Sequence, residues 1–271
     1  MTIKIAVIGF GNIAKAIITP LLDKRLINPG DVYCLVSSKN SVENIKKNYK
    51  FDVNIFQANS KDLSLIWDCN VKLLSVKPQQ LGEIQEPPNV KKHDNDLLIS
   101  ILAGVSISKL NNKFPNHRCV RVVTNIPTIV GKGLTGITWG KEITKAQKEF
   151  TRKIFGSSSK IYEFSENYLD TFLALTSSGP AIIALIIEAL SDGGLSGGLQ
   201  KKLSEELVLE MLLGTISLIK EKSLTTADLK NMVTSPGGTT IAALRVLEKK
   251  GLRSALIESI VSASNRSKEF S

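Results

Sequence analysis

Two glycine-rich stretches near opposite ends of the chain contain the residue types that bind anions. The first is "GFGNIA", Gly9 to Ala14, and the second is "SPGGTT", Ser235 to Thr240. Each lies directly before a stretch whose apolar residues have helical spacing. The first-turn amides of a helix have no acceptor within the helix, and the helix dipole makes that end positive. Because glycine lets a ligand approach the backbone closely, both stretches are candidate anion sites.

The first stretch has the pattern G-x-G-x-x-A and follows a β-branched run, "KIAVI". In the first βα turn of a dinucleotide-binding domain, Gly9 would make the tight turn and Gly11 would admit a pyrophosphate. Ala14 would let the helix pack closely on the strand. We therefore predict a dinucleotide site here, the alternative being a tight turn that binds nothing.

The end of the second predicted strand reads "VSSKN" and has no acidic residue. Sites for NAD usually place Asp or Glu at this point to bind the ribose hydroxyls. Ser37, Ser38 and Lys39 instead offer two hydroxyls and a positive charge to a 2′-phosphate. This favours NADPH over NADH, although a polar loop without a ligand would look the same.

Later strand ends add further candidates. Lys77 precedes Pro78, which holds it extended where open α/β sheets bind ligands, although it could equally be a solvated lysine. Ala103 and Gly104 are small enough for a nicotinamide ring to lie close, and Asn125 ends another strand.

The chain has two histidines, His93 and His117, both in polar, loop-like stretches. We expect both on the surface, and neither is a candidate catalytic residue.

The second glycine-rich stretch permits two interpretations. A helix beginning near Thr239 would present free amides at Gly238 to Thr240, and Ser235 could add a hydroxyl, which suits a carboxylate. The alternative is an elaborate helix cap after a proline turn. The residues alone leave both open.

The elements that must position these residues alternate between strands and helices in the first half of the chain. Near-continuous apolar strands separated by amphipathic helices predict a doubly wound, mostly parallel sheet buried on both faces. The predicted strands are 3–9, 31–37, 71–78, 96–104, 119–125, 133–140 and 159–164, and the predicted helices are 12–22, 41–49 and 145–155.

From Glu166 onwards the apolar spacing is helical. Pro180 suits a first helical turn, and Thr225 with Asp228 resembles an N-cap with an acid in the first turn. We therefore predict a dinucleotide-binding domain over residues 1–163 and an all-helical domain over residues 164–271. Several of these helices are apolar around most of their circumference, which predicts a homodimer, or a dimer-based oligomer, through this domain.

Composition and charge narrow the function classes. The chain is 42% hydrophobic and 22% charged, with a net charge of +10 that comes from residues 1–163 (24 Lys+Arg against 13 Asp+Glu). No basic cluster is interleaved with aromatic residues, so we expect no nucleic-acid partner. No apolar run reaches the roughly 18 residues of a membrane span. The three cysteines are widely spaced, which predicts neither a disulfide framework nor a metal site and favours the cytoplasm.

The motifs together resemble the pyrroline-5-carboxylate reductase family. The resemblance is carried by "GFGNIA", "SVKPQ", "SILAGVS", "RVVTNIPTIVGKGLTG", "SSGPAIIALIIEALSDGG" and above all "VTSPGGTTIAALRVLEKKGLRSALIE". These stretches follow in the family's order over nearly the whole chain. The resemblance implies reduction of 1-pyrroline-5-carboxylate to L-proline with NADPH or NADH, the last step of proline biosynthesis.

The resemblance also implies binding residues. Cofactor would bind at Gly9, Phe10, Gly11, Asn12, Ile13, Ala14, Ser37, Ser38, Lys39, Asn59, Val76, Lys77, Pro78, Ala103 and Gly104. Substrate would bind at Asn125, Ser235, Gly237, Gly238, Thr239 and Thr240, near a dimer interface. Since a protonated imine accepts hydride better than a neutral one, Thr240 is the expected catalytic residue, as a hydrogen-bond partner of the ring nitrogen.

The chain departs from the family at a few positions beside this site. Ser177 replaces a usual glycine and Ile182 a usual tyrosine, and Val123 and Ile126 stand where Met and Thr are common. Two other functions stay open. A related NADP-linked oxidoreductase acting on a C–O bond would be expected to carry a catalytic lysine on a later helix. A non-catalytic NADP-binding protein would not require "SPGGTT".

Overall fold

The computed structural model describes residues 3–58, 60, 62–87 and 96–269. The chain divides into two compact units. The first consists of Met1–Ser177 together with Ala263–Ser271, and the second is Ser178–Ser262.

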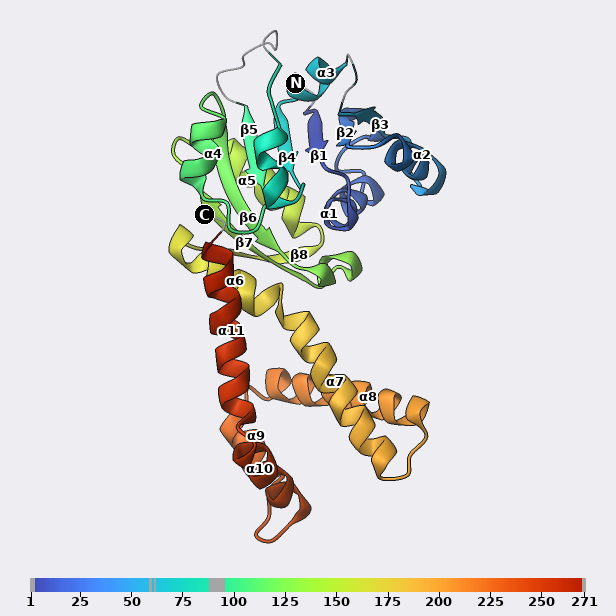
Figure 1. Cartoon of the computed structure of the whole chain (residues 1–271), viewed down its shortest axis with the longest axis vertical. Helices are drawn as coiled ribbons and strands as arrows, with labels where there is room; N and C mark the ends of the chain where they lie inside the picture. Colours follow the sequence, from blue (N-terminus) through green and yellow to red (C-terminus); the bar gives the residue numbers. More distant parts are fainter. Residues whose placement is uncertain (1–2, 59, 61, 88–95, 270–271) are drawn as a thin grey trace. The chain divides into compact units, whose positions relative to one another are not determined.

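The first unit is built on an eight-stranded sheet with the order β3-β2-β1-β4-β5-β6-β7-β8 (Figure 1). Only the β6–β7 pair is antiparallel among the pairs of this sheet that the structure describes. The strands are β1 (Ile5–Ile8), β2 (Val32–Val36), β3 (Asn54–Gln57), β4 (Val71–Leu74), β5 (Leu97–Ser100), β6 (Arg118–Thr124), β7 (Gly133–Trp139) and β8 (Ser159–Glu163).

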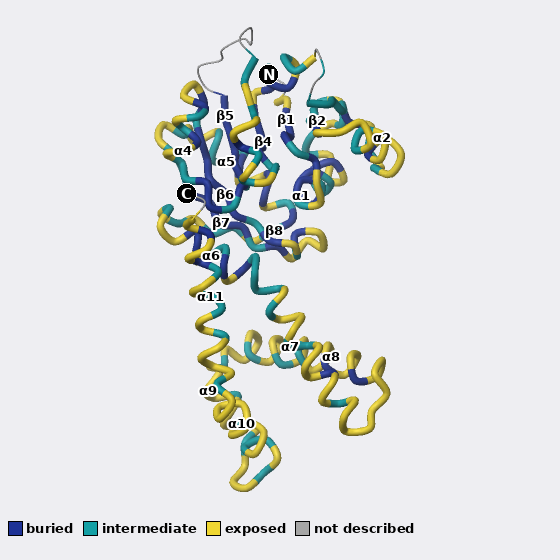
Figure 2. The backbone as a smooth tube through the Cα atoms, viewed as in Figure 1, coloured by how far each residue is buried: buried dark blue, intermediate teal, exposed yellow. Residues whose placement is uncertain are grey.

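Helices cover both faces of this sheet, which explains why its strands are apolar at nearly every position. Ile5 and Val7 of β1 pack in one cluster with residues of α1, α2 and α5, while Ala6 and Ile8 pack in another with α3 and α4. Figure 2 shows these strands as buried. The helices are α1 (Asn12–Asp23), α2 (Lys39–Asn48), α3 (Leu63–Trp67), α4 (Ile107–Lys113), α5 (Lys145–Gly156) and α6 (Leu169–Thr176).

The predicted fold class is confirmed: a doubly wound, mostly parallel sheet precedes a helical region. Three local differences concern the strands. β5 ends at Ser100 rather than at residue 104, because the chain turns at Gly104, whose φ is +69°. β3 was not among the predicted strands, and its four residues are only half-buried at the sheet edge. β4 ends at Leu74 rather than Pro78, because Pro78 begins a short 3-10 helix, Pro78–Glu83.

The second unit contains α7 (Gly179–Ser196), α8 (Lys201–Glu221), α9 (Thr226–Met232), α10 (Thr239–Lys249) and most of α11 (Leu252–Lys268). Pro180 lies in the first turn of α7, and Thr225 caps α9 by accepting from the Asp228 amide at 3.1 Å, both as predicted. A Cβ on Gly194 of α7 would lie 2.1 Å from Ser204 Oγ of α8, so glycine permits the close packing of these two helices.

The helices of the second unit have little core of their own (Figure 2). Of residues 178–262, all of which the structure describes, only Ser191, Ser204 and Val208 are buried. Large apolar side chains point outward instead: Leu185, Leu213 and Met232 are 66%, 61% and 65% exposed. Since an isolated soluble chain rarely exposes apolar surface on this scale, these helices are built to be covered.

The compact units and the predicted domains have different bounds, since the sequence pattern changes between residues 163 and 164. The division falls after Ser177, and the last residues of α11 belong to the first unit. Packing explains the difference, because α6 lies on the sheet. A Cβ on Gly136 of β7 would come within 2.9 Å of Leu169 and Phe172, so this glycine makes room for α6.

One described helical stretch, Glu166–Ser196, has the length and mean hydropathy of a membrane span, although no uninterrupted apolar run of that length was found in the sequence. Length and composition are the whole of this signal. The stretch includes α6, which packs on the sheet of the first unit, and Pro180 in the first turn of α7. Its apolar character therefore has another explanation in the packing of a globular protein.

The predicted surface position of His117 is wrong. Its ring is buried against Trp67 and Phe114, with centroids 6.0 Å from each, and neither ring nitrogen has a hydrogen-bond partner among the described residues. Burial, together with the charge of Lys72, lowers the pKa of His117 to about 4. Lys72 is itself buried in β4 and pairs with Asp96. His93 lies outside the described residues.

This lowered pKa predicts a loss of stability in acid. Between the ordinary histidine pKa, about 6.5, and about pH 4, the unfolded chain binds a proton at His117 that the folded chain does not. The free energy of unfolding should therefore fall with falling pH, by about 1 kcal/mol per pH unit from this group. His117→Phe should lose less stability than the wild type between pH 7 and pH 5, measured by urea unfolding. Equal losses in the two proteins would contradict the assignment.

Candidate functional site

The glycine turn after β1 has the geometry that a bound pyrophosphate requires. Gly9 has φ of +91°, and a Cβ there would lie 2.8 Å from the Ser75 carbonyl oxygen, so only glycine fits without strain. Gly11 is the N-cap of α1, and a Cβ there would meet no atom within 4 Å. The first turn of α1 has no acidic residue. An open face over positive helix-end amides suits an anion.

A cavity of about 520 Å³ lies beside this turn, at the carboxyl ends of β1, β2 and β4. Predicted cofactor residues line it: Gly9, Phe10, Gly11, Ser37, Val76 and Lys77. The lining also includes residues that sequence reasoning missed, among them Ser41, Leu63, Trp67, Ser75 and Gln80. A Gly-x-Gly motif reveals only its own turn, whereas these side chains reach the cavity from other elements.

Other predicted cofactor residues do not line this cavity. Asn12 and Ile13 are in the first turn of α1, and Ala14 is buried where the helix meets the sheet. Ala103 and Gly104 follow β5, and Gly104 has φ of +69°. Asn59 lies outside the described residues.

The residues after β2 begin helix α2, in addition to their predicted role in binding the cofactor. Ser38 is the N-cap of α2, and its Oγ accepts from the Ser41 amide at 3.2 Å. Lys39, the first helical residue, is exposed, with its Nζ 3.9 Å from Glu43 Oε1. An exposed ion pair of this length is weak. The positive helix start and the Lys39 ammonium therefore remain able to bind an anion.

Lys77 has the extended backbone predicted from Pro78, with φ of −71° and ψ of 145°. Its side chain is exposed at the end of β4, and its amide donates to Gln80 Oε1 at 3.3 Å. Pro78 begins the short helix that follows. This proline thus fixes the direction of the chain along the cavity wall.

Asn125 is buried and already has two partners. Its Oδ1 accepts from the Leu134 amide at 2.8 Å, and its Nδ2 donates to the Thr176 carbonyl at 3.0 Å. Ser177 Oγ donates to the Thr124 carbonyl at 3.0 Å. The end of β6 is thereby fastened to the end of α6. A substrate contact of Asn125 stays a prediction, and the structural contacts account for its side chain.

In the second unit, the "SPGGTT" loop leads into a helix at the predicted residue. α10 begins at Thr239, with Gly238 as its N-cap and no acidic residue in its first turn. Gly237 has φ of +72°, and the Gly238 amide donates to the Ser235 carbonyl at 3.1 Å. The prediction of a free amide at Gly238 is therefore wrong, because the turn before α10 uses it. A Cβ on Gly238 would lie 2.5 Å from Ser235 Oγ, so glycine lets the serine hydroxyl lie over the helix start. Thr240 is half-buried and Thr239 exposed.

The doubly wound sheet and its glycine turn define a dinucleotide-binding protein. Residues 4–104 match a family model described as NADP oxidoreductase coenzyme F420-dependent, and residues 166–270 match one described as pyrroline-5-carboxylate reductase dimerisation. The chain is 37% identical to the pyrroline-5-carboxylate reductase of Synechocystis sp., covering 100% of this chain and 99% of the relative. This chain belongs to the pyrroline-5-carboxylate reductase family.

Solved structures of the family agree over the full length. The pyrroline-5-carboxylate reductase of Coxiella burnetii is 31% identical, with a TM-score of 0.81 over 100% of this chain and 99% of that one. The enzyme of Streptococcus pyogenes is 27% identical, with a TM-score of 0.87 over 99% of each chain. The Plasmodium falciparum pyrroline carboxylate reductase, solved with NADP bound, is 27% identical, with a TM-score of 0.84 over 99% of this chain and 98% of that one.

The two glycines of the turn should respond differently to alanine. Gly11→Ala adds a methyl group to open space at an ordinary backbone conformation, so stability should change little while the Kd for NADPH rises about tenfold or more. Gly9→Ala strains a positive φ and meets Ser75, which should cost about 1–3 kcal/mol of stability. Isothermal titration and thermal unfolding measure the two effects. Wild-type NADPH affinity in Gly11→Ala would contradict the assigned pyrophosphate site.

Proposed function

We propose that this chain reduces 1-pyrroline-5-carboxylate to L-proline with NADPH as the preferred cofactor and NADH as a possible one. The observation that carries the proposal is the identity of 37% to a curated pyrroline-5-carboxylate reductase over both whole chains, which includes both glycine-rich loops. The oxidoreductase is proposed to act in the cytoplasm. The buried, unbridged state of Cys34, Cys69 and Cys119 supports a reducing compartment.

The residues around the first glycine turn fit a dinucleotide. The first-turn amides of α1, exposed beside Gly11, would bind the pyrophosphate. The start of α2, with Ser37, Ser38 and Lys39, would bind a 2′-phosphate. Val76 to Pro78 and Ala103 with Gly104 would lie along the nicotinamide end, and Asn59 is proposed as a further contact. When bound, NADPH supplies the hydride.

The "SPGGTT" loop fits the substrate's carboxylate and imine. The amides of Thr239 and Thr240 at the start of α10 would bind the carboxylate, with Ser235, Gly237 and Gly238 shaping the loop. Thr240 would hydrogen-bond the ring nitrogen. Hydride adds to the imine carbon, the C=N π electrons pass to nitrogen, and the nitrogen keeps the proton it carries in the iminium form. Thr240 thus orients the ring rather than acting as a strong acid.

We propose a homodimer, or a larger assembly of dimers, formed through the helical region. The match of residues 166–270 to a dimerisation family and the exposed Leu185, Leu213 and Met232 support it. Burying such side chains against a second copy would supply roughly 1.5–3 kcal/mol each. An active monomer in analytical ultracentrifugation would contradict the dimer.

Cofactor preference can be tested at the start of α2. Ser38→Asp preserves the helix cap, since Asp caps as well as Ser, but places a negative charge beside the proposed 2′-phosphate. The ratio of kcat/KM for NADPH to that for NADH should fall about tenfold. Ser38→Asn is the matched control, because it caps without charge, and it should leave the ratio nearly unchanged. A ratio equal in all three proteins, or a wild type that prefers NADH, would contradict the proposal.

The role of Thr240 predicts a selective loss of substrate turnover. Thr240→Val keeps the β-branched shape but removes the hydroxyl. Because a hydrogen bond to a charged group contributes about 1.5–3 kcal/mol, kcat/KM should fall about tenfold to a few hundredfold. Affinity for NADPH should stay the same, measured by titration.

Thr239→Val is the control for disturbing the same helix start, because Thr239 is exposed and begins α10. It should retain most of the activity. Equal losses in the two variants would show that the threonines serve only to cap the helix, and full activity in Thr240→Val would remove that residue from the mechanism.

A further inference from the structure

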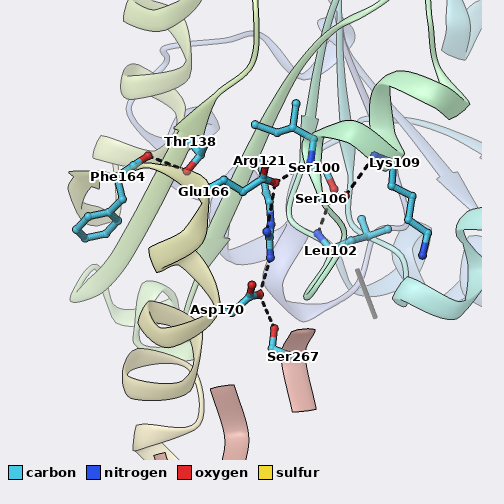
Figure 3. Close-up of polar contacts among 11 residues, drawn as sticks. Ser100, Leu102, Ser106, Lys109, Arg121, Thr138, Phe164, Glu166, Asp170 and Ser267 are labelled. Carbon is cyan, nitrogen blue, oxygen red and sulfur yellow. Dashed lines mark hydrogen bonds and ion pairs between the residues drawn. The ribbon is translucent and has the colours of Figure 1, made fainter. Parts of the chain in front are cut away.

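The loop between β5 and α4, residues 101–106, contains Ala103 and Gly104 and is fixed at both ends by side chains (Figure 3). At its start, the Leu102 amide donates to Ser100 Oγ at 3.3 Å. At its end, the Ile107 amide donates to Glu166 Oε1 at 2.7 Å. Glu166 lies 59 residues further along the chain, so a distant carboxylate holds the end of this loop.

Glu166 is in turn held by Arg121, which is buried in β6. Arg121 pairs in register with Ser100, the last residue of β5, and therefore lies next to the start of the loop. Its Nη1 donates to Glu166 Oε1 at 3.3 Å, so the same carboxylate oxygen accepts from the loop amide and from the guanidinium. A buried guanidinium requires such partners to offset its lost hydration.

The guanidinium of Arg121 has two arms: Nη1 bonds to Glu166 beside the loop, and Nη2 points away from the loop. Its Nη2 donates to Asp170 Oδ1 of α6 at 2.7 Å, and Ser267 Oγ of α11 donates to the same oxygen at 2.8 Å (Figure 3). This second arm fastens α6 and the end of α11 to the sheet. One buried arginine therefore serves two contacts that can be disturbed separately.

We propose that Glu166, oriented by Arg121, is a positioning residue for the nicotinamide half of the cofactor. Its carboxylate fixes the Ile107 amide, and hence the backbone of Ala103 and Gly104. The role rests on the proposed assignment of these two residues to the nicotinamide end. Glu166 touches neither cofactor nor substrate in this account, so its effect passes through the loop. The Asp170 arm contributes stability only.

Full-length variants separate the two arms. The Kd values of NADPH and of adenosine 2′,5′-bisphosphate, which carries the 2′-phosphate and lacks the nicotinamide, are measured by isothermal titration. Glu166→Ala should raise the Kd of NADPH about three- to tenfold, the effect of one lost hydrogen bond, and leave that of the bisphosphate within twofold. Glu166→Gln keeps an Oε1 acceptor and should restore most of the NADPH affinity.

Ser267→Ala is the matched control on the other arm. It should lower the melting temperature and change neither Kd. Glu166→Ala that weakens both ligands equally, or neither, would overturn the positioning role, as would a failure of Glu166→Gln to recover affinity. If the wild type binds NADPH no more tightly than the bisphosphate, the nicotinamide half adds no affinity, which would overturn the assignment of Ala103 and Gly104. A wild-type protein that binds NADPH but does not reduce the imine would instead count against the proposed function alone.

Discussion

Two helix starts without an acid of their own are the feature on which the function of this protein depends. α1 and α10 each begin at a glycine cap, and neither has Asp or Glu in its first turn. The free amides and the dipole make each start positive, and an external anion is the natural partner. α9 shows the contrast, because Asp228 occupies its first turn and bonds to Thr225. The Asp228 carboxylate therefore occupies the position at the start of α9 that an external anion would take.

The parallel sheet determines which residues can surround the first of these starts. Parallel strands bring their carboxyl ends to one edge, so Gly9, Ser37 and Val76 meet there although they are widely separated in sequence. Gly104 and Asn125 follow the next two strands in the sheet order. The β7 strand reverses direction after β6. Beyond β6, this edge of the sheet therefore packs against α6 and adds no further ligand-binding loop. Arg121 and Asn125 hold α6 there through hydrogen bonds.

Local patterns made much of this predictable. The strands, the glycine turn and the start of α10 at Thr239 depend on neighbouring residues, and the sequence contains all of that information. β3 was missed because four half-buried residues at a sheet edge have no strong pattern. The burial of His117 depends on Trp67, fifty residues earlier in the chain and brought close only by the fold. The partners of Arg121 likewise lie 45 and 49 residues away.

The extent of the compact units likewise depends on contacts between residues that are distant in sequence. Apolar spacing becomes helical near residue 164. The packing of α6 on Gly136 of β7, a contact between distant segments, nevertheless extends the first compact unit to Ser177. The exposed leucines of the second unit were expected to be buried, and the single chain leaves them uncovered. The apolar pattern predicted that a second copy would cover these side chains, and the single chain shows only that they are exposed.

The most direct test of hydride transfer to the imine follows one hydrogen atom. The protein is incubated with 1-pyrroline-5-carboxylate and NADPH that carries deuterium at the transferable C4 position, and the product is analysed by mass spectrometry. Direct hydride transfer should give L-proline that is heavier by one mass unit, with the deuterium on the former imine carbon. No proline, or proline without deuterium, would contradict hydride transfer from the dinucleotide to the imine.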